Sequence, residues 1–184
     1  TYYPVGVALA TLVSANEESE FALTAISSAG SLENVKLLRD NQAQFATMLS
    51  IFATWAYEGE GPILRPQNHM RSVTALWPNV EHLLLRSDFV TEGTFSDFGR
   101  LNGRRVSIGM RNSGAEITGF YILDKLGIDH EEDLSVAYLG YGPSADALQD
   151  GNIFGLNAPG GPPMAAITRA HALLGNQLTI LSIN

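Results

Sequence analysis

Short apolar runs alternate along the chain with stretches in which apolar residues recur every three or four positions. Such alternation predicts strands followed by helices. Leu32, Val35 and Leu38, for example, lie at helical spacing after Ser31, a suitable N-cap residue. The predicted strands are 21–27, 44–50, 70–77, 80–86, 105–110, 134–139, 153–157 and 178–183. The predicted helices are 31–40, 51–57, 115–126, 144–149 and 163–174.

The order of these elements predicts an α/β fold with mainly parallel sheets and helices on both faces. Residues 70–86 are predicted to form a hairpin around a Pro-Asn turn. The stretch 87–103 is rich in small and turn residues, so it is predicted to connect a partial first lobe, 1–86, to a second lobe, 104–184. Ligands of such sheets bind where strands lead into helices, so these turns are the expected place of function.

Composition narrows the classes of function. The 184 residues include 11 Lys and Arg against 19 Asp and Glu, which gives a net charge of 11 − 19 = −8. An acidic chain without a basic cluster is unsuited to nucleic acid. The lack of cysteine excludes disulfides, thiolate metal sites and a cysteine nucleophile. No apolar run is long enough to span a membrane, and any signal peptide is expected to have been removed before Thr1.

Motifs for catalysis or cofactors are weak. The four His residues show no paired spacing, so no metal site is predicted. Ser113 and Ser144 lack the G-x-S-x-G frame and are interpreted as N-cap residues. Gly140–Ala145 fits G-x-G-x-x-A, but no acidic residue ends the next strand, so a dinucleotide remains an alternative only. The acidic run Asp129–Asp133 is interpreted as solvated surface. We therefore predict a binding protein without a cofactor, not an enzyme.

Three helix starts carry small polar residues, at Thr1–Pro4, Ser28–Ser31 and Arg111–Gly114. The first turn of a helix offers free backbone N–H groups and the positive end of the helix dipole. These features make a helix start suitable for an anion such as a carboxylate. The sequence therefore predicts anion-binding turns in both lobes.

Charged and aromatic side chains near these turns add to the candidate site. Arg111 either pairs with a ligand carboxylate or neutralises Glu116 or Asp124, and the sequence leaves both possibilities open. Tyr2–Tyr3 and Trp77 offer flat apolar faces and hydrogen-bond donors for a pocket wall, with core packing as the alternative for Trp77.

The same turns carry a family resemblance. The segments YYPVG (2–6), SSAGSLENVKLLRDNQAQFA (27–46), RVSIGMRNSGAEITG (105–119) and ADALQDGNI (145–153) resemble the TAXI family, the extracytoplasmic solute receptors of TRAP transporters. The resemblance implies a two-lobed, periplasmic-binding-protein type II-like fold located in the periplasm. It further implies that a small carboxylate-bearing solute is captured between the lobes and delivered to TRAP permease subunits. Glutamate-like amino acids, dicarboxylates and other organic acids are the implied solutes.

By position, the resemblance implies a set of ligand contacts. They are Tyr3, Gly30, Ser31, Ser50, Asn112, Ser113 and Gly114, with Asn157 in the wall from the second lobe. Tyr2, Trp77 and Arg111 complete the candidate site.

The chain also departs from the family pattern. Ser50 lies between Leu49 and Ile51 where the family is polar, and Arg111 replaces a proline, so an acid with an apolar or aromatic body is expected. Family members have a strand before Tyr2 and a final return to the first lobe, so the chain is expected to be the middle part of a longer protein. A nucleotide-using α/β enzyme and the effector-binding domain of a transcriptional regulator remain alternatives.

Overall fold

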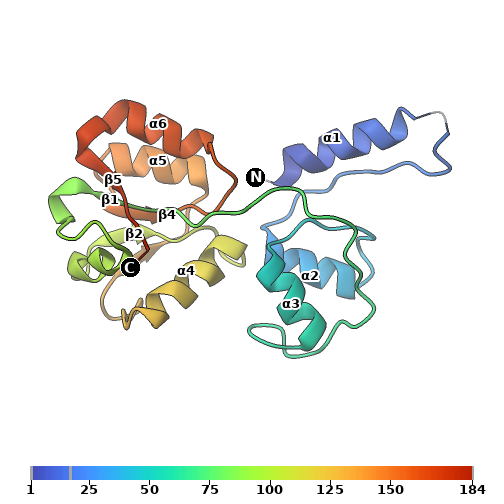
Figure 1. Ribbon diagram of the computed structural model, residues 1–184, viewed down its shortest axis with the longest axis horizontal. Coiled ribbons are helices and arrows are strands. Elements are labelled where there is room, and N and C mark those ends of the chain that lie inside the picture. The colour runs from blue at the N-terminus through green and yellow to red at the C-terminus, as the bar shows by residue number, and fades with distance from the viewer. Residues whose placement is uncertain (1, 17, 184) are drawn as a thin grey trace. The chain divides into compact units, whose positions relative to one another are not determined.

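The computed structural model describes residues 2–16 and 18–183 (Figure 1). The chain divides into two compact units, Thr1–Val73 and Thr74–Asn184. The sequence predicted the division within 87–103 instead.

The segment 87–103 belongs to the second unit because it is packed there. It folds into two 3-10 helices, η1 (Ser87–Phe89) and η2 (Phe95–Leu101). Phe98 and Leu101 are fully buried in the core of this unit. The sequence does not reveal their burial, because turn-forming residues surround them. The Asp97 carboxylate fixes the turn between the two helices by accepting the N–H groups of residues 91–93.

The second unit is built on one five-stranded sheet in the order β3-β2-β4-β1-β5. The strands are β1 (Leu83–Arg86), β2 (Arg105–Ser107), β3 (Ser135–Ala137), β4 (Gly155–Asn157) and β5 (Leu178–Ile180). β2 pairs in parallel with β3 and β4, whereas β1 is antiparallel to both β4 and β5. β2, β3, β4 and β5 therefore run in one direction and β1 alone runs against them. The predicted mainly parallel sheet is confirmed.

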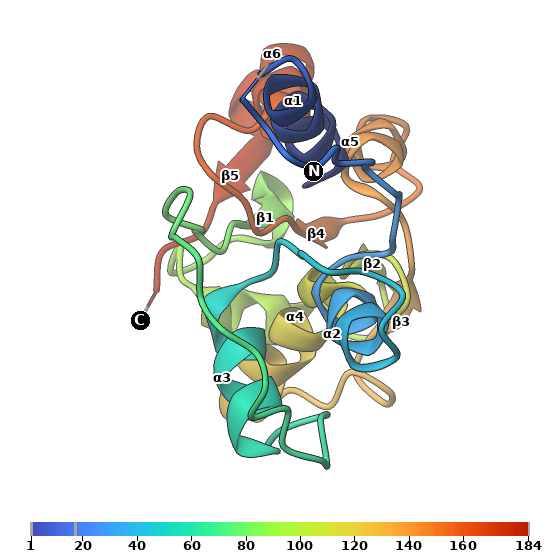
Figure 2. The same ribbon diagram turned by 90° about the vertical axis from the view of Figure 1, so that its right-hand side faces the viewer.

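Helices cover both faces of this sheet. α4 (Gly114–Lys125) lies on one face, and α5 (Tyr141–Gln149) and α6 (Ala165–Leu174) lie on the other, as both ribbon views show (Figures 1 and 2). Alternate residues of β1 serve the two layers, because successive side chains of a strand point to opposite faces. Leu84 packs in the cluster with α5 and α6, and Leu83 and Leu85 pack in the other cluster. The short 3-10 helix η3 (Gly175–Gln177) links α6 to β5.

The predicted hairpin within 70–86 does not form. β1 pairs with β4 and β5, which follow it by about 70 residues or more along the chain, and Val80 forms an isolated bridge with Gly160. Leu83–Leu85 is apolar on both faces, which suits a central strand covered by two helix layers better than an exposed hairpin. A local turn signal could not reveal partners so distant in the sequence.

The described residues of the first unit form three helices, α1 (Tyr2–Ser14), α2 (Ser31–Arg39) and α3 (Ser50–Glu58). The predicted strands 21–27 and 44–50 are not strands, and none occurs among the described residues of this unit. Neither segment pairs with another among the described residues. A strand is stable only when its N–H and C=O groups find a partner.

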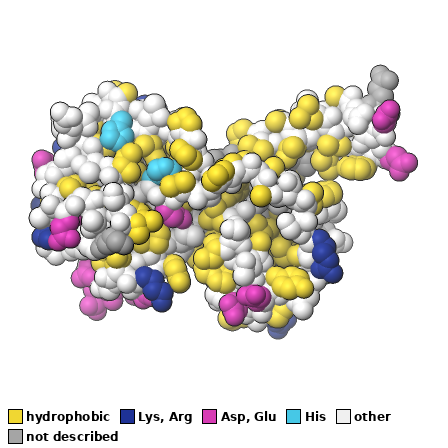
Figure 3. All heavy atoms as spheres, viewed as in Figure 1, with side chains coloured by type: hydrophobic (Ala, Val, Ile, Leu, Met, Phe, Trp, Pro, Cys, Tyr) yellow, Lys and Arg dark blue, Asp and Glu magenta, His cyan; other side chains and the backbone are white. Residues whose placement is uncertain are grey.

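Several apolar side chains of the first unit are exposed. α1 has no buried residue, and hydrophobic side chains gather along it in Figure 3. Val7, Leu9 and Leu12 on α1 are exposed, as is Phe21 in the segment that follows. No helix in the described part of the chain is long and apolar enough to cross a membrane.

Candidate ligand-binding site

Helix α4 begins at a reciprocal cap. Ser113 is the N-cap residue, and its hydroxyl accepts a hydrogen bond from the N–H of Glu116 at 3.2 Å. The Glu116 carboxylate in turn accepts the N–H of Asn112 at 2.5 Å, and Asn112 adopts a left-handed φ of 62°. The interpretation of Ser113 as an N-cap is confirmed. The same bonds show that two N–H groups at this helix start are already held by the chain's own side chains.

The remaining N–H groups of this turn belong to Gly114 and Ala115, the first two residues of α4. They have no acceptor inside the helix, and no other acceptor is recorded for them among the described residues. The Glu116 carboxylate adds a negative charge nearby, which weakens the attraction of the helix start for an anion. Of the N–H groups of the predicted anion-binding turn, those of Gly114 and Ala115 therefore remain without a recorded acceptor among the described residues.

Arg111 is the candidate cation of this turn, because it stands three residues before Gly114 in the sequence. Its guanidinium lies over the Tyr138 ring, with Cζ 3.7 Å from the ring centroid, and the residue is exposed. In the part of the chain that the structure describes, no ion pair joins Arg111 to Glu116 or Asp124. Stacking occupies one face of the guanidinium and leaves its N–H-bearing edge available for a carboxylate.

Asn157 lies beside the first turn of α4. This last residue of β4 is 1% exposed, and its Nδ2 donates to the C=O of Ala115 at 2.9 Å. A Cβ at Gly119 would lie 2.8 Å from the same Nδ2, so glycine is needed for the helix to come this close. The Oδ1 atom of Asn157 is buried and has no partner among the described residues.

Glu81 is a half-buried acid that the sequence did not predict as part of the site. Burial raises its pKa, and the adjacent side chains of Thr118 and Asn157 oppose the rise only in part. Its Oε2 atom is buried and finds no hydrogen-bond donor within the described residues. Glu81 stands two residues before the Leu83–Leu85 run, which is the one signal in the sequence that this carboxyl is buried.

Trp77, the remaining candidate of the second unit, packs on the backbone after β4. A Cβ at Gly161 would lie 2.7 Å from the Trp77 Cδ1 atom, so the indole lies directly against this glycine. Trp77 is half-buried, so it is neither a fully buried core residue nor a fully exposed one.

Two helix starts come together in the first unit. Gly30 is the N-cap residue of α2, with a φ of 133°, and Ser31 is its first residue. The buried Ser31 hydroxyl accepts the N–H of Leu49 at 3.1 Å, and Leu49 directly precedes Ser50, the first residue of α3. The prediction that Ser31 is the N-cap residue of α2 is wrong by one position, since Gly30 holds that position. The Ser31 hydroxyl instead joins the starts of the two helices.

The start of α2 also carries a carboxylate of its own. Glu33 accepts the N–H of Ala29 at 2.6 Å, just as Glu116 accepts the N–H of Asn112 before α4. Tyr2 and Tyr3 lie in the first turn of α1, where Tyr2 is half-buried and Tyr3 is exposed. Thr1, the first residue of that predicted turn, lies outside the described residues.

Two other sequence motifs have structural roles. Ser144 is not an N-cap: Gly140 holds that position of α5, and the Ser144 hydroxyl bonds to the Gly140 C=O and to Ser107 of β2. The acidic residues of 129–133 are exposed, and Asp129 and Asp133 accept backbone N–H groups of their own turn. No group of three or more His, Asp or Glu placed to hold a metal ion was found among the described residues.

The sheet of the second unit, with helices on both faces, has the architecture of a lobe of the periplasmic-binding-protein type II-like class. The chain belongs to the NMT1-like family, whose model matches residues 1–184. The predicted fold class is therefore confirmed.

Three solved structures show the same fold. A binding protein component of an ABC phosphonate transporter from Pseudomonas aeruginosa matches at 11% identity with a TM-score of 0.60, over 98% of this chain and 58% of that protein. The alkanesulfonate-binding protein SsuA from Xanthomonas axonopodis pv. citri, bound to MOPS, matches at 15% identity with a TM-score of 0.57. The match covers 99% of this chain and 57% of that protein. The periplasmic aliphatic sulphonate binding protein SsuA from Escherichia coli matches at 14% identity with a TM-score of 0.53. The match covers 98% of this chain and 53% of that protein. The chain thus spans little more than half the length of these proteins.

Proposed function

We propose that this chain is part of an extracytoplasmic solute receptor, located in the periplasm, that binds a small organic anion and catalyses no reaction. The start of α4 carries the proposal. There the exposed edge of Arg111, stacked on Tyr138, lies in the turn that leads to the unused N–H groups of Gly114 and Ala115. A guanidinium and helix N–H groups in one turn are suited to an anionic oxygen.

The proposed solute carries a carboxylate, as in a glutamate-like amino acid, a dicarboxylate or another organic acid. A planar carboxylate offers two oxygens that match the edge of a guanidinium. The apolar residues Leu49 and Ile51 on either side of Ser50 favour an acid with an apolar or aromatic body. The proteins of similar fold are described as binding sulfonates and phosphonates, so these anions are the competing solutes.

We propose Tyr3, Ser50 and Trp77 as further ligand contacts, on the resemblance and residue chemistry alone. Gly30 and Asn112 contribute backbone geometry at two helix starts, with φ angles of 133° and 62°. The hydroxyls of Ser31 and Ser113 are already bonded to backbone N–H groups, so their contribution is to shape the turns.

The proposed receiver of the solute is a TRAP-type permease, because the motifs at 2–6, 27–46 and 105–119 resemble the TAXI receptors. An ABC permease is the second candidate, because one protein of similar fold is a component of an ABC phosphonate transporter. Cross-linking the solute-loaded receptor to membranes of its own cells distinguishes them. Capture of TRAP membrane subunits supports the first, and capture of ABC permease subunits refutes it.

Native mass spectrometry tests the receptor proposal. The protein is purified gently from its own cells and its mass is compared before and after denaturation. We expect a one-to-one complex with a small organic acid that is released on unfolding. A bare protein mass, together with no heat of binding against carboxylates, sulfonates or phosphonates, would refute the proposal.

A further inference from the structure

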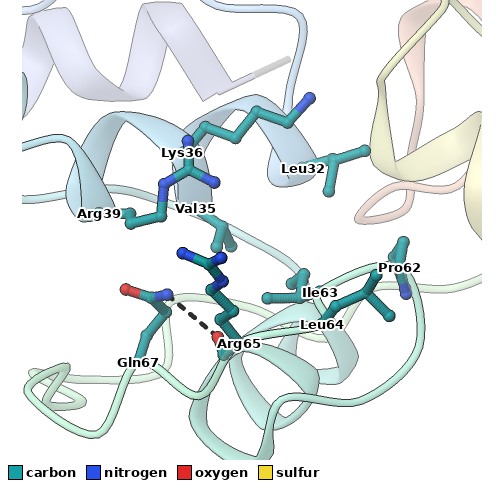
Figure 4. A pocket seen from close by; sticks show the side chains of 9 residues that line it. All are labelled: Leu32, Val35, Lys36, Arg39, Pro62, Ile63, Leu64, Arg65 and Gln67. Carbon is teal, nitrogen blue, oxygen red and sulfur yellow. Dashed lines mark hydrogen bonds between the residues drawn. The ribbon is translucent and has the colours of Figure 1, made fainter.

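A hollow of about 260 Å³ lies within the first unit, between α2 and the loop formed by residues 59–67 (Figure 4). Its inner walls are apolar: Leu32 and Val35 come from α2 and Ile63 comes from the loop, and all three are buried. Leu64, on the loop side, is 86% exposed, so the hollow opens beside an unprotected apolar side chain. An apolar wall of this kind suits an apolar ligand body.

The outer part of the hollow is cationic. Lys36, Arg39 and Arg65 line it, which are three of the 11 basic residues of the chain, whereas none of its 19 acidic residues does so. Figure 4 shows Arg65 rising from the loop toward α2, which carries the other two. In a chain with a net charge of −8, this grouping of cations is suited to attract an anion.

Two of the three cations lack an acidic partner. Arg39 is occupied by the neighbouring Asp40, with its Nε 2.7 Å from one carboxylate oxygen and its Nη2 2.9 Å from the other. Within the described residues, no ion pair is recorded for Lys36 or Arg65. These two groups are therefore available to a ligand.

The loop that forms the lower wall is held in place by hydrogen bonds. The Gln67 N–H donates to the C=O of Ala56 in α3 at 2.6 Å, and its side-chain Nε2 donates to the Arg65 C=O at 3.0 Å. The Ile63 N–H donates to the C=O of Glu60 at 2.9 Å. Arg65 thus projects from a backbone whose path is fixed, which lowers the cost of positioning its charge.

We propose that this hollow is a second binding site, for a small organic anion with an apolar body, separate from the site at α4. The apolar body lies against Leu32, Val35 and Ile63, and the anionic group is held by Lys36 and Arg65. The volume of the hollow is just below the roughly 300–1,000 Å³ of common ligand pockets, so a short ligand fits the hollow. The proposal uses no residue of the α4 site.

Methyl NMR of the full chain tests this site with defined probes. Hexane-1-sulfonate and hexanoate supply both parts of the ligand, hexan-1-ol supplies only the apolar body, and sulfate supplies only the charge. We expect the two organic anions to shift the methyl signals of Leu32, Val35, Ile63 and Leu64 in a saturable way. Equal shifts with hexan-1-ol, or no shifts with either anion, would overturn the proposal.

Charge-removing variants make the test specific. The double variant Lys36→Gln and Arg65→Gln is expected to weaken anion binding by about tenfold or more, because charge-assisted hydrogen bonds are lost. Arg71→Gln is the matched control: Arg71 is exposed, lies in the same unit outside the hollow, and donates to two backbone C=O groups. Circular dichroism checks that each variant is folded. Unchanged binding in the folded double variant would refute the site.

One further variant separates this site from the proposed receptor function. Arg111→Gln is expected to leave the methyl shifts at the hollow unchanged, whatever it does to solute binding at α4. Methyl shifts that disappear in this variant would overturn the separateness of the two sites. Loss of solute binding at α4 alone would leave the second site standing.

Discussion

Asp97 and Glu81 are acidic residues of the same unit whose surroundings act on them in opposite ways. Burial opposes ionisation of Asp97, but the N–H groups of residues 91–93 and the Arg100 guanidinium more than offset it, so its pKa lies below the usual value. Glu81 has no comparable set of donors, and burial raises its pKa. The number of donors around a buried carboxyl therefore decides which way its proton equilibrium moves.

Replacing Asp97 by Asn is expected to lower the free energy of unfolding by about 1–3 kcal/mol at neutral pH, because one acceptor oxygen becomes an NH₂ group that faces donors. The lowered pKa of Asp97 means that its stabilisation is present above the pKa of the unfolded chain and is lost as pH falls through the folded one. Urea unfolding at several pH values measures both effects. A variant as stable as the parent at neutral pH would contradict this role.

The substitution Glu81→Gln is expected to change stability in the opposite sense. Because the pKa of Glu81 is raised, its favourable contribution is complete below the unfolded pKa and is lost as pH rises through the folded pKa. The Gln variant should therefore equal the parent in acid and exceed its stability at and above neutral pH. Thermal unfolding across this range measures the difference, with the exposed Glu131→Gln as control. Parallel curves for parent and Glu81→Gln would contradict it.

Neither carboxyl was recognised from the sequence. The burial of Asp97 depends on the folding of a turn-rich segment onto the core, and that of Glu81 on β4 and α4, which follow much later in the chain. Arg111 and Asn157, by contrast, stand at strand-to-helix turns or strand ends that local pattern locates. The surroundings of a residue could be predicted where they depend on its neighbours in the sequence. They could not be predicted where segments distant in the sequence form them.

At the scale of elements, α2 and α4 share one device. A glutamate three residues after the N-cap residue accepts the N–H of the residue before the N-cap: Glu33 with Ala29, and Glu116 with Asn112. The bond stabilises the helix start but places a negative charge at the end that would otherwise attract an anion. A receptor built on these helix starts therefore depends on added cations such as Arg111.

Glu116→Gln tests this conflict. Gln keeps an acceptor for the Asn112 N–H but removes the negative charge beside the α4 start, so the affinity for an anionic solute should rise by about two- to fivefold. Calorimetric titration of the solute measures the change. Glu131→Gln, an exposed substitution elsewhere in the unit, should leave the affinity unchanged. Weaker binding in Glu116→Gln would show that the carboxylate itself helps to hold the solute.

Helices were predicted better than strand pairing. The five helices expected from periodicity correspond to α2–α6, since spacing and end residues are local signals. The hairpin within 70–86 and the strands 21–27 and 44–50 failed, because a strand is defined by its partner. β1 finds its partners late in the sequence, and the segments 21–27 and 44–50 find none among the described residues of the first unit.

At the scale of the whole molecule, the distribution of charge matters more than its sum. The chain carries a net charge of −8, yet Lys36 and Arg65 face one hollow and Arg111 stands at the start of α4. The chain belongs to the NMT1-like family and shares its fold with three solved proteins, of whose length it covers 53–58%. Its acidic surface therefore contains local places where an anion is attracted.

The most direct test of the receptor proposal is isothermal titration of glutamate, succinate, phenylacetate and methanesulfonate into three proteins. Arg111→Gln is compared with the parent and with a matched control, Arg104→Gln. The Arg104 guanidinium also lies over aromatic rings, with its Cζ 4.6 Å from the Phe89 ring centroid and 4.8 Å from that of Phe154. We expect at least one carboxylate to bind the parent and Arg104→Gln equally, and Arg111→Gln about tenfold or more weakly. Equal affinity in all three proteins, or binding of none of these anions to the parent, would contradict a carboxylate receptor that uses Arg111.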